Sequence, residues 1–513
     1  MRSHVKEAWE AAEGKRRPLV TRCEKYAAFT IPIICPTDGY NQQSTELQTD
    51  YQSVGALAVN SLANKLILAL FAPSRPFMRY EIPAGISEEL GVAVGQIQSL
   101  LATAEKDSMR LLDQMATRPR LYEVCRHLIV TGNCLLILGN DRESPLRVLG
   151  IKKYTVKRSM SGKVVDIIIK EVVSFAELEI EVQQLLNQLP AYKHMNPEDP
   201  RTCQDVTWFT RVQLQGDGRY HVTTYVDDVA LPAKYNGVYS PEELPYRPLT
   251  WELPDGQDYG IGLVEQCAGD FMALSALSEA ELKAAILASE FRWIVNPAGN
   301  TQPEDLMETE NGAAIPGVKD DIIALSASGA GVAHGLQLMD TVLAKYVNRI
   351  GRTFLLGSSV IRDAERVTAE EIRMQAQELE TSLGGVYSRL AVDFQLPLAY
   401  WLARMSGVSL GDTGIRPTII TGLDALSRNA DLENLKLCIV DMAQLQAAMQ
   451  GPLEFVLNAT AIADAIFAGR GVDPKLYVNP PEVQKQLMAQ RQQQQLEQAV
   501  AGPVAGAAAQ AQQ

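Results

Sequence analysis

The chain has 513 residues, a hydrophobic fraction of 46% and a formal net charge of −14 at pH 7. This length allows about three average domains, and the hydrophobic fraction supports real cores. The acidity argues against a protein that holds nucleic acid by neutralising phosphates, because such proteins present basic stripes. Plain solubility is the simplest explanation of the charge.

The sequence also lacks export and membrane signals. Residues Met1 to Tyr26 are rich in Lys, Arg and Glu and contain no apolar segment of a secretory signal, so we expect synthesis in a cytoplasm. The longest apolar run, Leu62 to Phe71, is far shorter than the ~20 residues that span a bilayer. The seven cysteines form no C-x-x-C pair, which favours reduced thiols over disulfides or a metal site.

The first 140 residues are predicted to be mainly helical. One helix is expected to carry an apolar stripe, formed by Val54, Leu57, Ala58, Leu62, Leu66 and Leu70. A second, largely apolar helix is predicted over Leu121 to Leu138. The basic run Lys15 to Arg17 is interpreted as a solvated face of an N-terminal helix.

From about Leu146 the pattern changes to the alternation that is typical of strands. The β-branched run Val164 to Val173 predicts one strand. A hairpin is predicted where Val212 and Leu214 lead into a Gly-Asp-Gly turn and Tyr220 to Thr224 leads out. An antiparallel β region is therefore inserted among helices, and the fold class is α+β, mainly helical.

Two long helices are predicted next. The first, from Leu263 to Ile294, has so little polar surface that we expect burial on more than one side. The second has an apolar stripe of Leu336, Met339, Leu343, Tyr346, Ile350 and Phe354. Between them, residues 296–331 are rich in Pro and Gly and contain one credible strand, Asp321 to Ala327. The residue pattern of the first helix fits two places equally well: the centre of a monomeric core and a contact between subunits.

A further long helix is predicted to begin near Ala369. Thr368 and Glu371 form a T-x-x-E capping box, in which each side chain can bond the other residue's amide. The pair Gly384 and Gly385 is expected to weaken or bend this helix, and Pro397 to kink its far end, because proline lacks an amide proton.

This last region carries a family resemblance. RVTAEEIR followed by LGGVYS resembles the portal, or head-to-tail connector, proteins of short-tailed bacteriophages. Other resembling segments run in one order along nearly the whole chain: FTIPIICP, YQSVGALAVNSLANKLILALFAP, LIVTGNCLLIL, DGQDYGIG, WIVNPAGNTQP and IITGLDALSR. Residues 174–205 and those beyond about 485 resemble the family least.

The resemblance implies a portal fold with wing, stem, clip and crown regions that assembles as a ring. The implied divisions are a helical and β-rich wing (1–262), first stem helix (263–294), clip (295–332), second stem helix (333–356), tunnel loop (357–368), kinked wing helix (369–410), helical crown (411–485) and low-complexity tail (486–513). At ~1.5 Å per residue, the first stem helix would be roughly 45 Å long.

The resemblance also implies a function. Such a ring, with twelve copies in this family, sits at one capsid vertex and admits DNA during packaging and ejection. It docks the large terminase subunit and later a tail adaptor. Major capsid, scaffolding and internal virion proteins are further implied partners, with transient contact to double-stranded DNA and none to a membrane. The implied location is the virion, and the host cytoplasm during assembly.

Two arginines in the implied tunnel loop admit two interpretations. Arg362 and Arg366 lie beside Asp363 and Glu365, and such neighbours usually form local surface ion pairs of ~0 to 1 kcal/mol each. Alternatively, a ring of these loops touches phosphates during DNA passage or after packaging stops.

Catalytic motifs are weak or missing. Gly329 and Gly331 follow a predicted strand and precede a helix, as in a dinucleotide-binding loop, but His334 occupies the third glycine position. No P-loop or nucleophile elbow is present, and the five histidines are isolated in sequence. We therefore predict no catalytic residue, cofactor or metal, and no enzyme activity. The alternatives are another structural virion protein, an internal core or adaptor component, or a dinucleotide-binding enzyme built around Gly329.

Overall fold

The computed structural model describes residues 4–47, 49–71, 76–81, 94–139, 146–199, 201–289, 291–295, 322–326, 330–356, 382–407 and 416–419, with Leu437 and Val440. The chain divides into two units, residues 1–421 and 422–513. All described residues except Leu437 and Val440 belong to the first unit.

The main core gathers around helix α2 (Val54–Leu70), with α1 (Val5–Phe29), α4 (Val94–Gln114) and α5 (Arg118–Thr131) as its helical neighbours. The predicted stripe on α2 is confirmed at Ala58, Leu62 and Leu66, which are fully buried. Leu57 was wrongly included, since its side chain is 58% exposed. At about 100° per residue, Leu57 lies on the opposite side of the helix from the buried residue Val59.

The predicted helix from Leu121 to Leu138 is wrong in its second half. Helix α5 ends at Thr131, and Gly132 follows with φ +73°. Strand β2 (Asn133–Ile137) comes next and pairs with β10 (Tyr246–Thr250) and β3 (Arg147–Leu149). A side chain at Gly132 would bring its Cβ within 2.4 Å of the Gly262 amide nitrogen, so the turn requires glycine. Periodicity does not distinguish a buried helix from a buried strand in an apolar run as short as residues 133–138, which explains the error.

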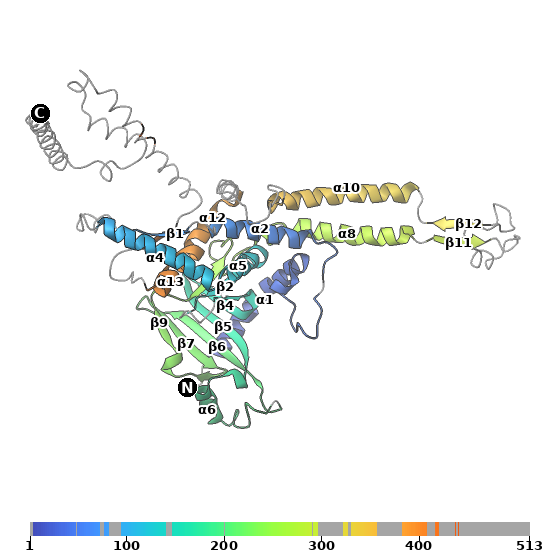
Figure 1. The fold of residues 1–513 in the computed structure, drawn as a ribbon. Coiled ribbons are helices and arrows are strands. Elements are labelled where there is room, and N and C mark those ends of the chain that lie inside the picture. Colours follow the sequence, from blue (N-terminus) through green and yellow to red (C-terminus); the bar gives the residue numbers. More distant parts are fainter. Residues whose placement is uncertain are drawn as a thin grey trace, which may run out of the picture. The chain divides into compact units, whose positions relative to one another are not determined.

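A larger antiparallel sheet forms the β region (Figure 1). Its strand order is β4 (Tyr154–Arg158), β5 (Val164–Ser174), β6 (Asp205–Leu214), β7 (Tyr220–Val226) and β8 (Val229–Ala230), with β9 (Gly237–Tyr239) also pairing with β7. The register Leu214↔Tyr220 and Val212↔Val222 confirms the predicted hairpin. The short helix α6 (Ile180–Asn187) lies between β5 and β6 in the chain.

Helix α1 packs against this sheet, and the packing corrects the interpretation of the basic run at residues 15–17. Lys15 and Arg17 are exposed, but Arg16 is only 3% exposed. Its guanidinium donates hydrogen bonds to the main-chain carbonyls of Ile151, Lys152 and Tyr154. A planar group with five donors can satisfy several carbonyls that no strand covers, so burial of Arg16 follows from the sheet edge beside it.

Two long helices follow the sheet. Helix α7 (Leu263–Gln266) is separated by Cys267 from α8 (Ala268–Ser289), and α10 (Ala330–Thr353) runs back beside α8 (Figure 1). The first helix therefore ends earlier than the predicted Ile294. Residues Phe291–Val295 form β11, which pairs antiparallel with β12 (Ile322–Ser326), the strand predicted between the helices. The two aromatic and two β-branched residues of Phe291–Val295 favour this strand over a longer helix.

The remaining described elements close the unit. Helix α12 (Gly385–Leu390), a π-helical turn (Ala391–Gln395) and α13 (Leu396–Met405) follow in sequence. Strand β13 (Arg416–Ile419) pairs with β1 (Met78–Glu81), so described residues 416–419 of the predicted helical crown (411–485) form a strand instead. The α+β, mainly helical class is confirmed by these elements.

Candidate functional site

Helices α8 and α10 form an antiparallel pair that is anchored in the core at the end that carries Asp270 and Arg349. Arg349 on α10 lies 2.9 Å from the Asp270 carboxylate near the start of α8. Leu274 and Ile350 are buried at the same end. Beyond these residues, none of the described residues 275–286 of α8 and 335–349 of α10 is buried. The pair thus leaves the core as two helices with open surfaces.

Large apolar side chains lie on these open surfaces. Leu282 and Ile286 on α8 are 50% and 52% exposed, and Leu338 on α10 is 61% exposed. The burial on more than one side that the sequence predicts for α8 is therefore not provided by the single chain. Exposed apolar groups gathered along one element are typical of a surface that another protein covers.

Acidic groups face each other between the two helices. A hydrogen bond with Asp340 on α10, with burial and the Asp340 charge adding to it, raises the pKa of Glu281 on α8. Glu279 and Lys283 form an ion pair of 2.6 Å on the same helix. The part of the pair around residues 279–283 and 340 therefore presents no concentrated positive charge, and the basic residues Lys345, Arg349 and Arg352 lie in the C-terminal half of α10.

The predicted kink residues lie within the described part. Gly384 has φ +48° and precedes α12, so the helical path is interrupted there and restarts at Gly385. Pro397 lies in the first turn of α13, directly after the π-helical turn. This segment is tied to the core, since the Gln395 amide donates to the Leu70 carbonyl at 2.5 Å and Trp401 Nε1 donates to the Gly139 carbonyl at 2.6 Å.

The other predicted site residues fall elsewhere. Arg362, Arg366, Thr368 and Glu371 lie outside the described residues. One functional candidate was missed: Lys65 on α2 is only 3% exposed. A lone lysine inside an apolar helical run was the available signal, because a buried ammonium needs a specific acceptor.

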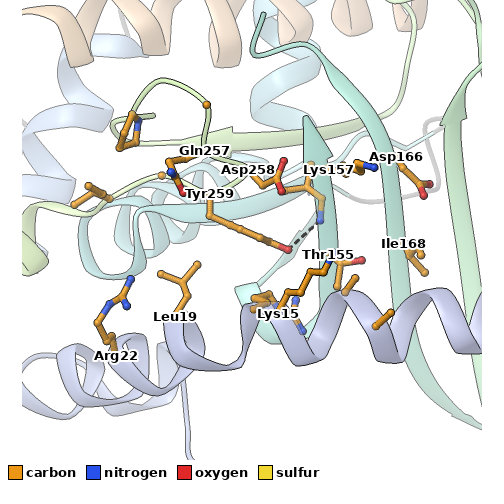
Figure 2. A pocket seen from close by; sticks show the side chains of 18 of the residues that line it. Lys15, Leu19, Arg22, Thr155, Lys157, Asp166, Ile168, Gln257, Asp258 and Tyr259 are labelled. Atoms are coloured by element: carbon orange, nitrogen blue, oxygen red, sulfur yellow. Dashed lines mark hydrogen bonds between the residues drawn. The ribbon is translucent and has the colours of Figure 1, made fainter. Parts of the chain in front are cut away.

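A cavity of about 690 Å³ lies between α1 and the edge of the sheet (Figure 2). The Val156 amide donates to the Tyr259 hydroxyl across it at 3.1 Å. Its acidic groups are engaged, because Asp166 pairs with Arg211 at 2.7 Å and Glu265 with Arg22 at 3.4 Å. The first contact ties β4 to the segment before α7, the second lies within the sheet, and the third ties α1 to α7, so none of these contacts places a reactive pair within the cavity.

The dinucleotide-binding alternative does not fit the topology that is described. Gly331 lies inside α10, and the strand before it, β12, belongs to a two-stranded antiparallel sheet. A dinucleotide loop requires a parallel sheet with crossover helices. Across the described ranges, no group of three or more potential metal-ligating side chains occurs.

The sequence matches the model of the family described as "Bacteriophage head to tail connecting protein" over residues 2–477. The chain belongs to this bacteriophage head-to-tail connecting protein family. The connector acts at the capsid vertex, and the role of DNA conduit follows from the family. Head-to-tail connecting proteins are structural components of the virion at the junction of head and tail.

Individual relatives span nearly the whole connector. It is 31% identical to the portal protein of Enterobacteria phage SP6 over 501 residues, which cover 97% of this chain and 94% of the relative. It is 32% identical to the portal protein of Escherichia phage T7, with 99% and 94% covered. The portal protein of Enterobacteria phage T3 is 33% identical, with 95% and 90% covered.

Solved structures give a weaker likeness. The neck of an empty GTA particle computed with C6 symmetry contains a chain with a TM-score of 0.36 and 15% identity, covering 82% of this chain and 94% of that chain. The neck of the native GTA particle computed with C12 symmetry gives 0.35 and 14%, with the same coverage. The family assignment of the connector rests on the sequence matches alone.

Membrane insertion finds no support in the described helices. None of them combines the length and the apolar character that a membrane span requires.

Proposed function

We propose that twelve copies of this connector form a closed ring in which α8 and α10 are the stem helices around the DNA passage. The observation that carries the proposal is the open apolar surface of this helix pair, represented by Leu282, Ile286 and Leu338. In a ring, each copy presents one face to the next and a different face to the previous copy, so a heterologous contact covers α8 and α10 on both sides.

The net negative charge of the connector favours the passage of DNA through the ring over tight binding of DNA by the walls of the ring. Twelve copies with −14 each carry 12 × −14 = −168. Phosphates approaching such a ring are repelled unless basic side chains are concentrated locally. We therefore assign the DNA contact to Arg362 and Arg366 in the loop 357–368, with Thr368 and Glu371 capping the helix after it.

The tip of the helix pair supplies the docking element. We assign the clip to residues 295–332, which begin at the last residue of β11 and include β12. A hairpin at the end of two long helices is suited to contact other proteins, because β11 and β12 lie at the end of α8 and α10 that points away from the core (Figure 1). We propose that it docks the large terminase subunit first and a tail adaptor afterwards.

The remaining assignments follow the same scheme. We assign residues 1–262 and 369–410 to the wing, 411–485 to the crown and 486–513 to a tail. Capsid, scaffolding and internal virion proteins are the further proposed partners, and assembly is proposed to occur in the host cytoplasm. The proposed role is geometric and electrostatic rather than catalytic.

Particle mass tests the proposal. Native mass measurement of the purified chain, combined with projection images down the particle axis, is expected to give a homogeneous ring of about twelve copies. The genome content of particles tests the function: particles assembled without this chain are expected to contain no packaged genome. Single chains or pairs, both in purified material and in virions, would contradict the ring.

A further inference from the structure

The C-terminal end of α10 is closed by two backbone hydrogen bonds that run back into the helix. The Leu355 amide donates to the Arg352 carbonyl at 3.3 Å, and the Leu356 amide donates to the Gly351 carbonyl at 2.7 Å. This pair of bonds is a Schellman motif, in which the first residue beyond the helix adopts a left-handed conformation. Leu355 occupies that position with φ +56°.

Leucine is an unfavourable residue for a left-handed position. Its Cβ crowds the following carbonyl, whereas glycine adopts this conformation without strain and is the usual residue there. The sequence offers a glycine two residues later, at Gly357. Local sequence therefore favours Gly357 as the left-handed residue that terminates the helix, but in the structure Leu355 takes that position shortly after Thr353.

Tertiary contacts hold the earlier end. Lys65 Nζ on α2 donates to the Leu355 carbonyl at 2.7 Å. The preceding residue, Phe354, is buried against Phe271, and Leu356 packs against the main core. The carbonyl end of a helix carries partial negative charge, so a buried ammonium is stabilised there, and Lys65 would be strongly destabilising without such an acceptor.

We propose that Lys65 is a positioning residue that selects Leu355 over Gly357 as the end of α10. When this cation is absent, the strain at Leu355 is relieved by two further helical residues. The helix then lengthens by about 3 Å, and the direction in which the chain leaves it turns by about 200°. Lys65 thereby sets where the segment after α10 begins.

The consequence for the connector rests on the proposed function, because residues 357–368 are the loop that we assign to DNA contact. A displaced starting point would move every such loop around the ring. Hydrogen exchange measures the helix end itself, so its result is independent of whether the loop contacts DNA.

Hydrogen exchange on the assembled ring tests the proposal, read by mass spectrometry on peptides that cover residues 350–360. In Lys65→Met, the Gly357 and Ser358 amides are expected to be bonded within the lengthened helix and to exchange at least about tenfold more slowly than in the parent ring. Unchanged or faster exchange at these amides would overturn the proposal.

Two double variants that differ only in the residue at position 355, glycine or alanine, distinguish relief of backbone strain from loss of the leucine side chain's packing. The double variant Lys65→Met, Leu355→Gly is expected to keep the parental exchange pattern, because glycine removes the strain that drives the extension. The matched double variant with Leu355→Ala keeps a Cβ and is expected to show the slow exchange of Lys65→Met alone. Equal behaviour of the two double variants would contradict a role for the left-handed conformation.

A second pair leaves Lys65 in place, so the test holds even if Lys65→Met does not assemble. In the parent background, Leu355→Gly is expected to slow exchange of the Leu356 amide about fivefold or more relative to Leu355→Ala, because only glycine stabilises the present helix end. Both variants lose the leucine side chain, so packing cancels in the comparison. Identical exchange in the two variants would mean that Leu355 is not strained and that Lys65 selects nothing.

Discussion

The ring of Phe271 packs edge-on against the ring of Phe354, with centroids 5.8 Å apart and ring planes at 76°. Phe271 lies near the start of α8, and Phe354 directly follows α10. Both side chains are fully buried in the main core. This aromatic contact therefore helps to join the two helices at the core, whereas none of the described residues 275–286 and 335–349 is buried.

The first prediction concerns this aromatic contact. Phe271→Ala is expected to lower the free energy of unfolding by about 3 to 5 kcal/mol, because it removes a buried ring and leaves a cavity. Chemical denaturation of the purified chain measures the change. Met160→Ala, at a residue that is 94% exposed, serves as the control and is expected to stay within about 0.5 kcal/mol of the parent. Equal losses in both variants would contradict the anchoring role.

The second prediction concerns ring closure. Leu282→Asp combined with Ile286→Asp is expected to convert the ring into single chains of 56.2 kDa, because charged groups cannot be buried in the proposed contact. Native mass measurement checks this, and circular dichroism checks that the chain still folds. Met160→Asp with Val172→Asp adds the same charge on other exposed apolar residues of the chain. That control is expected to form rings; rings from both double variants would exclude this surface.

The third prediction concerns stability at acid pH. Burial lowers the pKa of His127 from its ordinary 6.5 to about 4. Because the unfolded state binds the proton more readily, the stabilisation is fully present above pH 6.5 and is lost as the pH falls toward 4. The loss amounts to about 3 kcal/mol.

Denaturation curves between pH 7 and pH 4 measure this loss. His127→Gln has no titrating ring, so its stability is expected to fall by about 3 kcal/mol less across the same range. His221→Gln is a suitable comparison, since that histidine is not buried and lies beside Asp217. Parallel curves for the parent and His127→Gln would show that the buried ring does not resist protonation.

The fourth prediction concerns the loop arginines. Arg362→Ala with Arg366→Ala is expected to leave ring assembly intact and to reduce packaged or retained DNA, because contacts to phosphates are removed. Genome content per particle is the measurement. Arg219→Ala, at an exposed arginine in the turn between β6 and β7, is the control and is expected to have no effect. If the double variant packaged and retained DNA normally, local ion pairing with Asp363 and Glu365 would stand instead.

The fifth prediction concerns DNA affinity. The assembled ring is expected to bind linear duplex only weakly at physiological salt, because its net charge opposes phosphate binding. Titration of labelled duplex at several salt concentrations measures this. A sub-micromolar complex that is insensitive to salt would contradict an interior that lets DNA slide.

The sequence by itself determined the elements whose information is local. The hairpin around Asp217 follows from its turn residues, and the strand after Val164 from its β-branched run. The helix from Val54 to Leu70 follows from apolar spacing. The family was also identified from the sequence, since its motifs are continuous in the chain. Turn chemistry and periodicity act between near neighbours, so no fold was needed to recognise them.

Only the tertiary structure decided the features that depend on distant partners. Arg16 is buried because carbonyls near residues 151–154 lie beside it, and β2 is a strand because β3 and β10 flank it. The sequence likewise places Leu355 two residues before a glycine, but only the fold brings Lys65 to its carbonyl. An unsatisfied backbone group acquires its partner through packing, and packing brings together residues that the sequence separates by hundreds of positions.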